Sequence, residues 1–315
     1  MLVCSAALGS ATIGAALGAA PEIADAHGAR ADGPPPAVLH LPNPYPDQGP
    51  FAEREFAGSG GSGGGGKMYY RGGPVMGGLP NAYVIWYGDW NKTSGSDTPA
   101  GQQIVRDFLS SIGGSPYFNI NKTYSLSTTP ITGNVNYAGD ITSQYVAPTA
   151  TLSDQDVQNI VAEAFGAGLP VDENGVYFVL TASDVKKDGF CVSYCGWHTY
   201  GYYGASNIKY SFVGNPAQCM SSCSAQNVGP NGNAAVDAMV SVLAHELEEA
   251  VTDPNLNAWY DMFGYENADK CAWTYGTTKT APNGAKYNMV LNGKPYLIQR
   301  NWVNAKGGSC ALSYP

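Results

Sequence analysis

One stretch near the end of the chain, from Val236 to Pro254, constrains the fold most because it predicts a helix covered on two sides. At about 100° per residue, an apolar stripe forms on one side of this helix, made by Val236, Val240, Leu243 and Leu247. Apolar Met239 and Val242 flank the opposite side, which carries His245 and Glu249. Asn233 is the expected N-cap, and the step Asp253-Pro254 ends the helix. We therefore expect a helix between two layers, with its polar pair facing a cleft.

The polar residues of this helix have the order H-E-x-x-E, with His245, Glu246 and Glu249 at the defined positions. Residues four apart lie one above the other on a helix, so His245 and Glu249 can hold one divalent ion. Glu246 is then the predicted general base toward a metal-bound water. The usual zinc-protease helix has a second histidine at the position of Glu249. A solvated polar helix face is the alternative interpretation of the same three residues.

Acidic residues after the helix favour a metal site over a solvated face. Glu266 is the predicted third ligand, and Asp269 or Asp253 is the predicted partner of the ligand histidine. The ion is expected to be zinc in preference to calcium, although a carboxylate-rich calcium loop is the competing interpretation. His198 is the only other histidine beyond residue 66, and it is predicted as an additional ligand or as a donor to a reaction oxyanion. A structural hydrogen-bonding role for His198 is the alternative.

The N-terminal region is expected to be separate from the folded domain. Residues 1–20 form a small-residue apolar run that is followed by Ala24-Asp25-Ala26, which fits a secretory leader spanning residues 1–26 and cleaved after Ala26. A membrane anchor is the alternative for this run. Residues 27–66 are rich in Pro and then in Gly and Ser, as expected of a linker. A pro-segment with His40 as an inhibitory ligand is the alternative. The domain is predicted to span residues 67–315.

Cysteine usage also indicates an exported protein. Of the seven cysteines, Cys4 lies in the predicted leader, and the remaining six predict three disulfides. Pairing of cysteines that are close in sequence favours the bonds Cys191–Cys195 and Cys219–Cys223. The remaining bond, Cys271–Cys310, would then hold the C-terminal segment against the domain. A zinc knot of four thiolates from the two C-x-x-x-C pairs is the alternative.

Strand and helix signals are mixed along residues 67–315. Residues 82–87 and 176–180 are continuous β-branched and aromatic runs, which predict central strands buried on both faces. Helices are predicted after Thr98 and Ser153, and a hairpin is predicted for residues 287–291 and 296–299 around Asn292-Gly293. No regular βαβ alternation is evident, so we expect a single α+β domain with a zincin-like arrangement of a mixed sheet, an active-site helix and three disulfides.

Charge and composition limit the partners. Lys and Arg number 16 against 25 Asp and Glu, so no basic footprint for nucleic acid is expected, nor a membrane partner once the leader is removed. The sequons at Asn91 and Asn121 are compatible with glycosylation. Four tryptophans expected to be exposed suit a carbohydrate ligand and give a third interpretation, a wall-modifying role: Trp86, Trp90, Trp197 and Trp259.

Several segments together resemble the Exordium, or phosphate-induced protein, family of secreted proteins. They follow one another in order across residues 67–315 and comprise Tyr70–Met76, Tyr83–Trp90, Gly189–His198, Phe212–Cys219 and the block from Asn231 to Pro254. The helix is similar to that of microbial relatives with the sequence H-E-L-x-E-A-V-T-D-P. The resemblance implies an extracellular or cell-wall protein linked in plants to growth and to carbon or phosphate status, with no established enzymatic activity.

Two functions follow from these observations. The first is a secreted metal-dependent hydrolase, a zinc peptidase in which His245, Glu249 and Glu266 bind the ion, acting on an extracellular peptide. The alternative is a non-catalytic extracellular or cell-wall interaction protein of the Exordium type, with a structural metal or none.

Overall fold

The computed structural model describes residues 23–25, 38–40 and 66–315. Most of the predicted leader and linker lies outside these residues. The leader, its cleavage after Ala26, the linker and the inhibitory role of His40 therefore remain predictions.

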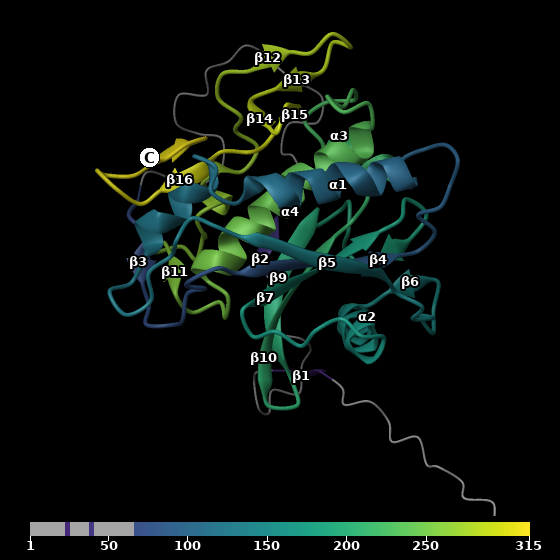
Figure 1. Cartoon of the computed structure of the whole chain (residues 1–315), viewed down its shortest axis with the longest axis horizontal. Coiled ribbons are helices and arrows are strands. Elements are labelled where there is room, and N and C mark those ends of the chain that lie inside the picture. Colours follow the sequence, from purple (N-terminus) through teal and green to yellow (C-terminus); the bar gives the residue numbers. More distant parts are fainter. Residues whose placement is uncertain (1–22, 26–37, 41–65) are drawn as a thin grey trace, which may run out of the picture.

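A βαβαβ unit forms the first half of the domain (Figure 1). It consists of β4 (Asn81–Tyr87), α1 (Pro99–Ile112), β5 (Asn136–Thr142), α2 (Asp154–Gly166) and β7 (Gly175–Thr181). Strand β4 pairs in parallel with β5 on one side and with β7 on the other. Because such crossovers are right-handed, α1 and α2 must lie on opposite faces of the sheet. The predicted lack of βαβ alternation was wrong here, since the polar strand β5 has no apolar run to reveal it.

The second half of the sheet is largely antiparallel. Strands β9 (Gly196–Tyr203) and β10 (Ser206–Val213) form a hairpin, and β10 adds in parallel to β7. The short strands β1 (Ile23–Asp25) and β2 (Val38–His40) both pair antiparallel with β9. The sheet order is β1-β9-β10-β7-β4-β5, with β2 also on β9. The expectation of an α+β protein with a mixed sheet is confirmed.

Helix α4 (Ala234–Thr252) is the helix predicted from the sequence, and it lies on the same side of the sheet as α1 (Figure 1). Its N-cap is Asn233, whose side chain accepts a hydrogen bond from the Val236 amide, as expected. Thr98 and Ser153 cap α1 and α2 in the same way. Within α4 only Ala234 and Ala238 reach solvent appreciably, so the helix is enclosed on all sides and its polar residues face the interior instead of a cleft.

Short elements complete the described chain. Five two-stranded pairs are present among the described residues: β3 (Tyr69–Tyr70) with β11 (Trp259–Tyr260), β6 (Thr151–Leu152) with β8 (Lys186–Lys187), β12 (Lys279–Thr280) with β13 (Lys286–Tyr287), β14 (Met289–Leu291) with β15 (Lys294–Tyr296), and β16 (Asn301–Val303) with β17 (Ser309–Ala311). The short helices are η2 (Phe118–Tyr124), η3 (Pro216–Gln218), α3 (Met220–Cys223) and η4 (Asp269–Cys271).

The hairpin turn predicted at Asn292-Gly293 is confirmed, and both residues adopt the positive φ that such turns require. The predicted strand bounds were wrong. Tyr287 pairs with Lys279 in a different hairpin, and the amide of Gln299 donates a hydrogen bond to Ser241 of α4.

Two of the three predicted disulfides were wrong. The bonds are Cys191–Cys219, Cys195–Cys223 and Cys271–Cys310, so only the last pair was predicted correctly. The reason is the β9–β10 hairpin, which brings the chain before β9 next to the chain after β10. Two parallel bridges therefore close across the hairpin ends, and no thiolates remain for a four-cysteine zinc knot.

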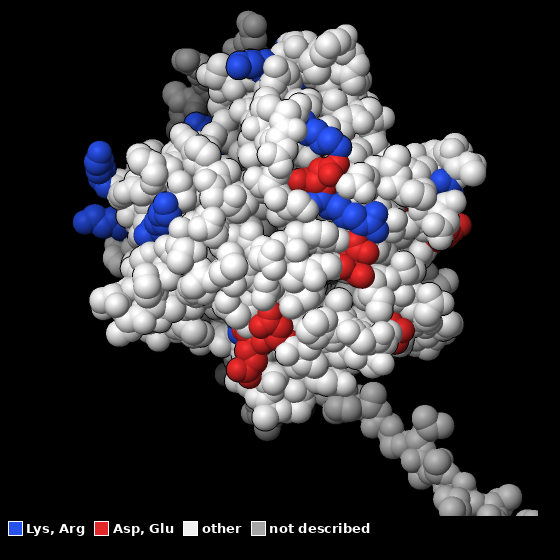
Figure 2. Space-filling model, viewed as in Figure 1, with Lys and Arg blue, Asp and Glu red and all other residues white. Residues whose placement is uncertain are grey.

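Three of the four tryptophans expected to be exposed are buried, which removes their support for a carbohydrate surface. Trp86, Trp90 and Trp197 are core residues, and Trp259 is partly buried. Charged side chains on the face shown in Figure 2 are sparse and mixed in sign. None of the helices in the described residues combines the length and the apolar character needed to cross a membrane.

Candidate metal centre

Three segments place acidic and histidine side chains together inside the domain. Helix α4 supplies His245, Glu246 and Glu249, strand β9 supplies His198, and the segment around η4 supplies Glu266 and Asp269. Gly196 permits the close packing of β9 on α4. A Cβ atom there would lie 2.7 Å from Val242 Cγ1 and 3.0 Å from Glu246 Oε1.

The first group of donors surrounds His198. Its Nδ1 atom lies 3.5 Å from Glu246 Oε2 and 3.5 Å from Glu249 Oε2. Its Nε2 atom lies 3.4 Å from the backbone oxygen of Asp253 and 3.7 Å from Glu266 Oε1. One ring nitrogen of His198 therefore faces two α4 carboxylates, and the other faces the segment after the helix.

The second group of donors surrounds His245. Its Nε2 atom lies 2.9 Å from Glu249 Oε1 and 3.5 Å from Asp269 Oδ1. The amide of Asp269 donates a hydrogen bond to Glu249 Oε1 at 3.1 Å. The two groups, His198–Glu246–Glu249 and His245–Glu249–Asp269, each have the spacing needed to hold a metal ion, and they share Glu249.

The centre is almost closed to water. His198, His245, Glu246, Glu249 and Glu266 are buried, and only the side chain of Asp269 has measurable exposure, at 11%. Within the described residues, both carboxylate oxygens of Glu246 and of Glu266 lack hydrogen-bond partners, as does Glu249 Oε2. Buried carboxylates without hydrogen-bond partners are energetically costly, and a bound cation removes that cost.

Burial and mutual repulsion perturb the protonation of these acids. Burial raises the pKa of Glu246 to about 7 and the pKa of Asp269 to about 6, and in both cases the charge of Glu249 adds to the effect. Burial also raises the pKa of Glu266 well above its usual range. Burial acts on Glu249 in the same direction, but His245 and His198 outweigh it and lower the pKa of Glu249 to about 2. Glu249 therefore has the lowest pKa of these four acids.

Burial and the neighbouring carboxylates also shift the pKa values of the two histidines. Burial alone would lower the pKa of both rings, but the surrounding carboxylates reverse the effect. The pKa of His245 rises to about 10, chiefly through Glu249, and the pKa of His198 rises well above its usual range, chiefly through Glu266. A divalent ion would replace these protons with its own charge.

The residues named from the sequence meet in one place, in an arrangement that differs from the predicted one. Glu249 and Asp269 are the carboxylates beside His245, whereas Glu266 approaches His198. Glu246 contacts His198 in the position of a ligand. Asp253 acts mainly at the end of α4, where its carboxylate accepts hydrogen bonds of 2.6 Å from the amides of Asn257 and Ala258.

Glu248 is a buried acid of α4 to which the sequence analysis assigned no role. Its Oε2 atom accepts a hydrogen bond of 2.6 Å from Asn301 Nδ2, and burial raises its pKa well above the usual range. The only sequence signal was its position in a helix expected to be covered on two sides. Glu248 therefore joins α4 to β16, apart from the histidine groups.

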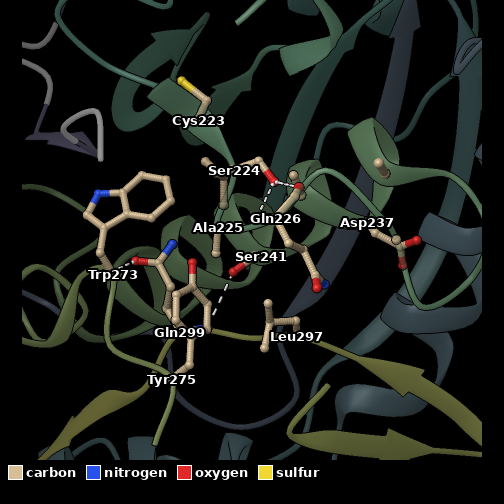
Figure 3. A pocket seen from close by; sticks show the side chains of 14 residues that line it. Cys223, Ser224, Ala225, Gln226, Asp237, Ser241, Trp273, Tyr275, Leu297 and Gln299 are labelled. Atoms are coloured by element: carbon tan, nitrogen blue, oxygen red, sulfur yellow. Dashed lines mark hydrogen bonds between the residues drawn. The ribbon is translucent and has the colours of Figure 1, made fainter. Parts of the chain in front are cut away.

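A pocket near α4 does not include the centre (Figure 3). Ser241 lines it, together with Gln299, Trp273 and Tyr275, and Gln299 bridges Ser241 and Trp273 by hydrogen bonds. The pocket includes α4 residues up to Val242, whereas the candidate metal ligands of the helix begin at His245. A substrate in this pocket would not touch the centre.

The described chain is thus an α+β protein with intrachain disulfides and a buried histidine–carboxylate centre. Its sequence matches the family model for the phosphate-induced protein 1 conserved region over residues 68–312. The chain belongs to this family, which includes the Exordium proteins, as the sequence resemblance indicated.

Curated relatives support the same assignment. The chain is 31% identical to Protein EXORDIUM-like 3 of Arabidopsis thaliana, over 75% of this chain and 80% of that relative. It is 32% identical to Protein EXORDIUM-like 5 of the same plant, over 75% of each. It is also 28% identical to Protein PHOSPHATE-INDUCED 1 of Nicotiana tabacum, over 73% of this chain and 83% of that relative. None of these names specifies a hydrolase or a metal.

Proposed function

We propose that this chain is a secreted, non-catalytic Exordium-type protein whose buried centre holds a divalent metal as a structural element. The observation that carries the proposal is the enclosure of His198, His245, Glu246, Glu249 and Glu266, whose polar atoms converge without access for a substrate. Imidazole nitrogens combined with carboxylates favour zinc over calcium, which prefers oxygen ligands. The side chain of Asp269 is the most exposed of the candidate ligands, so we propose that an ion enters from its side.

A structural role agrees with the places from which the ligands come. The ion would join β9, α4 and the η4 segment, and η4 is already fixed by the Cys271–Cys310 bond. Ligands from three segments lower the free energy of the folded state, because no such site exists in the unfolded chain. Three disulfides are typical of exported proteins, which supports secretion. We propose an extracellular or cell-wall component as the partner.

Elemental analysis of the purified full chain tests the metal. We expect tightly bound zinc after purification in metal-replete buffer and extensive dialysis. His245→Ala should lose ion from the centre, whereas Glu248→Gln is the matched control on the same helix and should keep the wild-type content. Wild-type protein without any bound metal would refute the proposal.

The second candidate function is a zinc peptidase, favoured by the H-E-x-x-E order and by the pKa of Glu246 near 7, which suits a general base. In that case Glu246→Gln keeps its metal and loses about 10²–10⁴-fold in cleavage rate. We expect instead that the wild type cleaves no member of broad protein and peptide panels. Cleavage by the wild type that Glu246→Gln abolishes at unchanged metal content would establish the peptidase.

A further inference from the structure

We infer that the centre holds two divalent ions bridged by the carboxylate of Glu249. The inference rests on the proposed metal binding and deepens it. The first ion would be bound by His198 Nδ1, Glu246 Oε2 and Glu249 Oε2, and the second by His245 Nε2, Glu249 Oε1 and Asp269 Oδ1. Each set combines one imidazole nitrogen with two carboxylate oxygens.

The helix itself places Glu249 in the bridging position. At about 100° per residue, Glu249 lies about 40° from His245 on one side and about 60° from Glu246 on the other. The two oxygens of its carboxylate are directed to different histidines. Oε1 lies 2.9 Å from His245 Nε2, whereas Oε2 lies 3.5 Å from His198 Nδ1. A single ion bound to one oxygen would leave the other set of donors unused.

Distances between the donors fit metal coordination. Bonds of about 2.1 Å at angles between 90° and 110° separate neighbouring ligand atoms by roughly 3.0–3.4 Å. In the His245 set, Nε2 lies 2.9 Å from Glu249 Oε1 and 3.5 Å from Asp269 Oδ1, and both histidine–carboxylate separations in the His198 set are 3.5 Å. The histidine–carboxylate separations are therefore close to those between neighbouring ligands of one ion, and all donor atoms of each set lie within 4.8 Å of one another.

The charge of the centre also calls for two ions. With both histidines neutral, as ligands must be, the four carboxylates of Glu246, Glu249, Glu266 and Asp269 carry four negative charges. One divalent ion leaves two of these charges to be neutralised by protons, whereas two divalent ions neutralise all four. The fifth acid nearby, Asp253, has its carboxylate held by two backbone amides. Uncompensated charge in a buried site is strongly unfavourable, so the second ion is stabilised.

The orientation of His198 supports its role as a ligand. Coordination through Nδ1 requires the proton on Nε2, and Nε2 faces the backbone oxygen of Asp253 at 3.4 Å and Glu266 Oε1 at 3.7 Å. Such a contact on the outer nitrogen is the usual way in which a ligand histidine is held in the correct tautomer. In this arrangement Glu266 either helps to hold His198 in this tautomer or contributes an oxygen to the first ion.

Metal counting with Mn²⁺ tests the inference on the full chain. Protein stripped with a chelator is loaded with Mn²⁺ under inert gas and freed of unbound ion, and its content is measured by elemental analysis. We expect two ions per chain in the wild type and in the control Glu248→Gln. Glu246→Gln and Asp269→Asn should each retain one ion, and Glu249→Gln should retain fewer than either. Near-ultraviolet circular dichroism verifies that each variant is folded.

Electron paramagnetic resonance of the loaded wild type, compared with the one-ion variant Glu246→Gln, tests the bridge through Glu249. Two Mn²⁺ ions that share a carboxylate are magnetically coupled, so the signal per ion should be weaker than in Glu246→Gln. A single ion in the wild type would overturn the two-ion centre while leaving the proposed structural metal intact. Two uncoupled ions would refute the bridge through Glu249. No bound Mn²⁺ at all would overturn the two-ion centre, and the zinc content of the purified chain then decides the structural metal separately.

Discussion

At the residue scale, the positions of the functional side chains followed from sequence pattern only where one helix carries them. The spacing of His245, Glu246 and Glu249 on a single helix fixes their relative directions. His198 is 47 positions before His245, and its approach to Glu246 depends on the packing of β9 on α4, which no local pattern encodes. The sequence could not show that Asp269, and not Glu266, lies beside His245, because this also depends on how the segment after α4 packs.

Gly196 is the residue that controls this packing, so Gly196→Ala should destabilise the protein by about 1–3 kcal/mol. The new methyl group would meet Val242 and Glu246 at distances that force β9 and α4 apart. Urea unfolding measures the loss, and metal retention should fall with it. Gly166→Ala is the matched control, because a Cβ atom at Gly166 meets nothing within 4 Å. Equal effects of the two substitutions would contradict this account of the packing.

Asp97 should make the stability depend on pH. Burial alone would raise the pKa of its carboxyl, but hydrogen bonds from Lys92, Ser96 and Ser183 outweigh burial and lower the pKa below its ordinary value. The unfolded chain then binds the proton more readily than the folded chain. Stability from Asp97 is therefore complete above the unfolded pKa of about 4 and is lost as the pH falls through the lower folded value.

The variant Asp97→Asn should cost about 1–3 kcal/mol near neutral pH, where the charged hydrogen bonds are lost. Chemical unfolding of wild type and variant across the acid range measures the difference, which should shrink as the pH is lowered. A difference that stays constant, or that grows in acid, would contradict the assigned pKa shift.

At the element scale, the helices were predictable and much of the sheet was not. Caps at Thr98, Ser153 and Asn233 are local signals, and the helices begin where these signals place them. Strands β4 and β7 were visible as buried apolar runs. Strands β5, β9 and β10 are rich in polar, aromatic and glycine residues, and only their partners in the sheet make them strands.

The disulfides could not be predicted from local sequence either, because pairing by proximity in sequence ignores the β9–β10 hairpin between the two cysteine pairs. We expect the bonds Cys191–Cys219 and Cys195–Cys223 in purified protein. Chymotrypsin cleavage after Tyr194 and cyanogen bromide cleavage after Met220 separate all four cysteines, so non-reduced mass spectrometry can assign the bonds. Fragments linking Cys191 to Cys195 would contradict the structure. Replacing Cys191 and Cys219 together by serine should cost about 2–4 kcal/mol.

At the scale of the whole molecule, the centre lies where separate parts of the fold meet. Helix α4 packs on the sheet through β9, and the segment after α4 returns through η4 to the same cluster. The C-terminal region is tied to η4 by Cys271–Cys310, so the proposed ion would restrain the same segment as the disulfide. Enclosure of this kind suits stabilisation of the fold better than turnover of a substrate.

Thermal unfolding of the full chain, with and without a chelator, tests the central claim that a buried metal stabilises this fold. An ion present at about 100 times its dissociation constant adds about 2.7 kcal/mol, which corresponds to roughly 5–10 °C in a domain of this size. We predict that chelation lowers the Tm of the wild type by this amount, that zinc restores it, and that His245→Ala responds less to either treatment. An unchanged Tm in wild-type protein from which bound metal has demonstrably been removed would contradict the account.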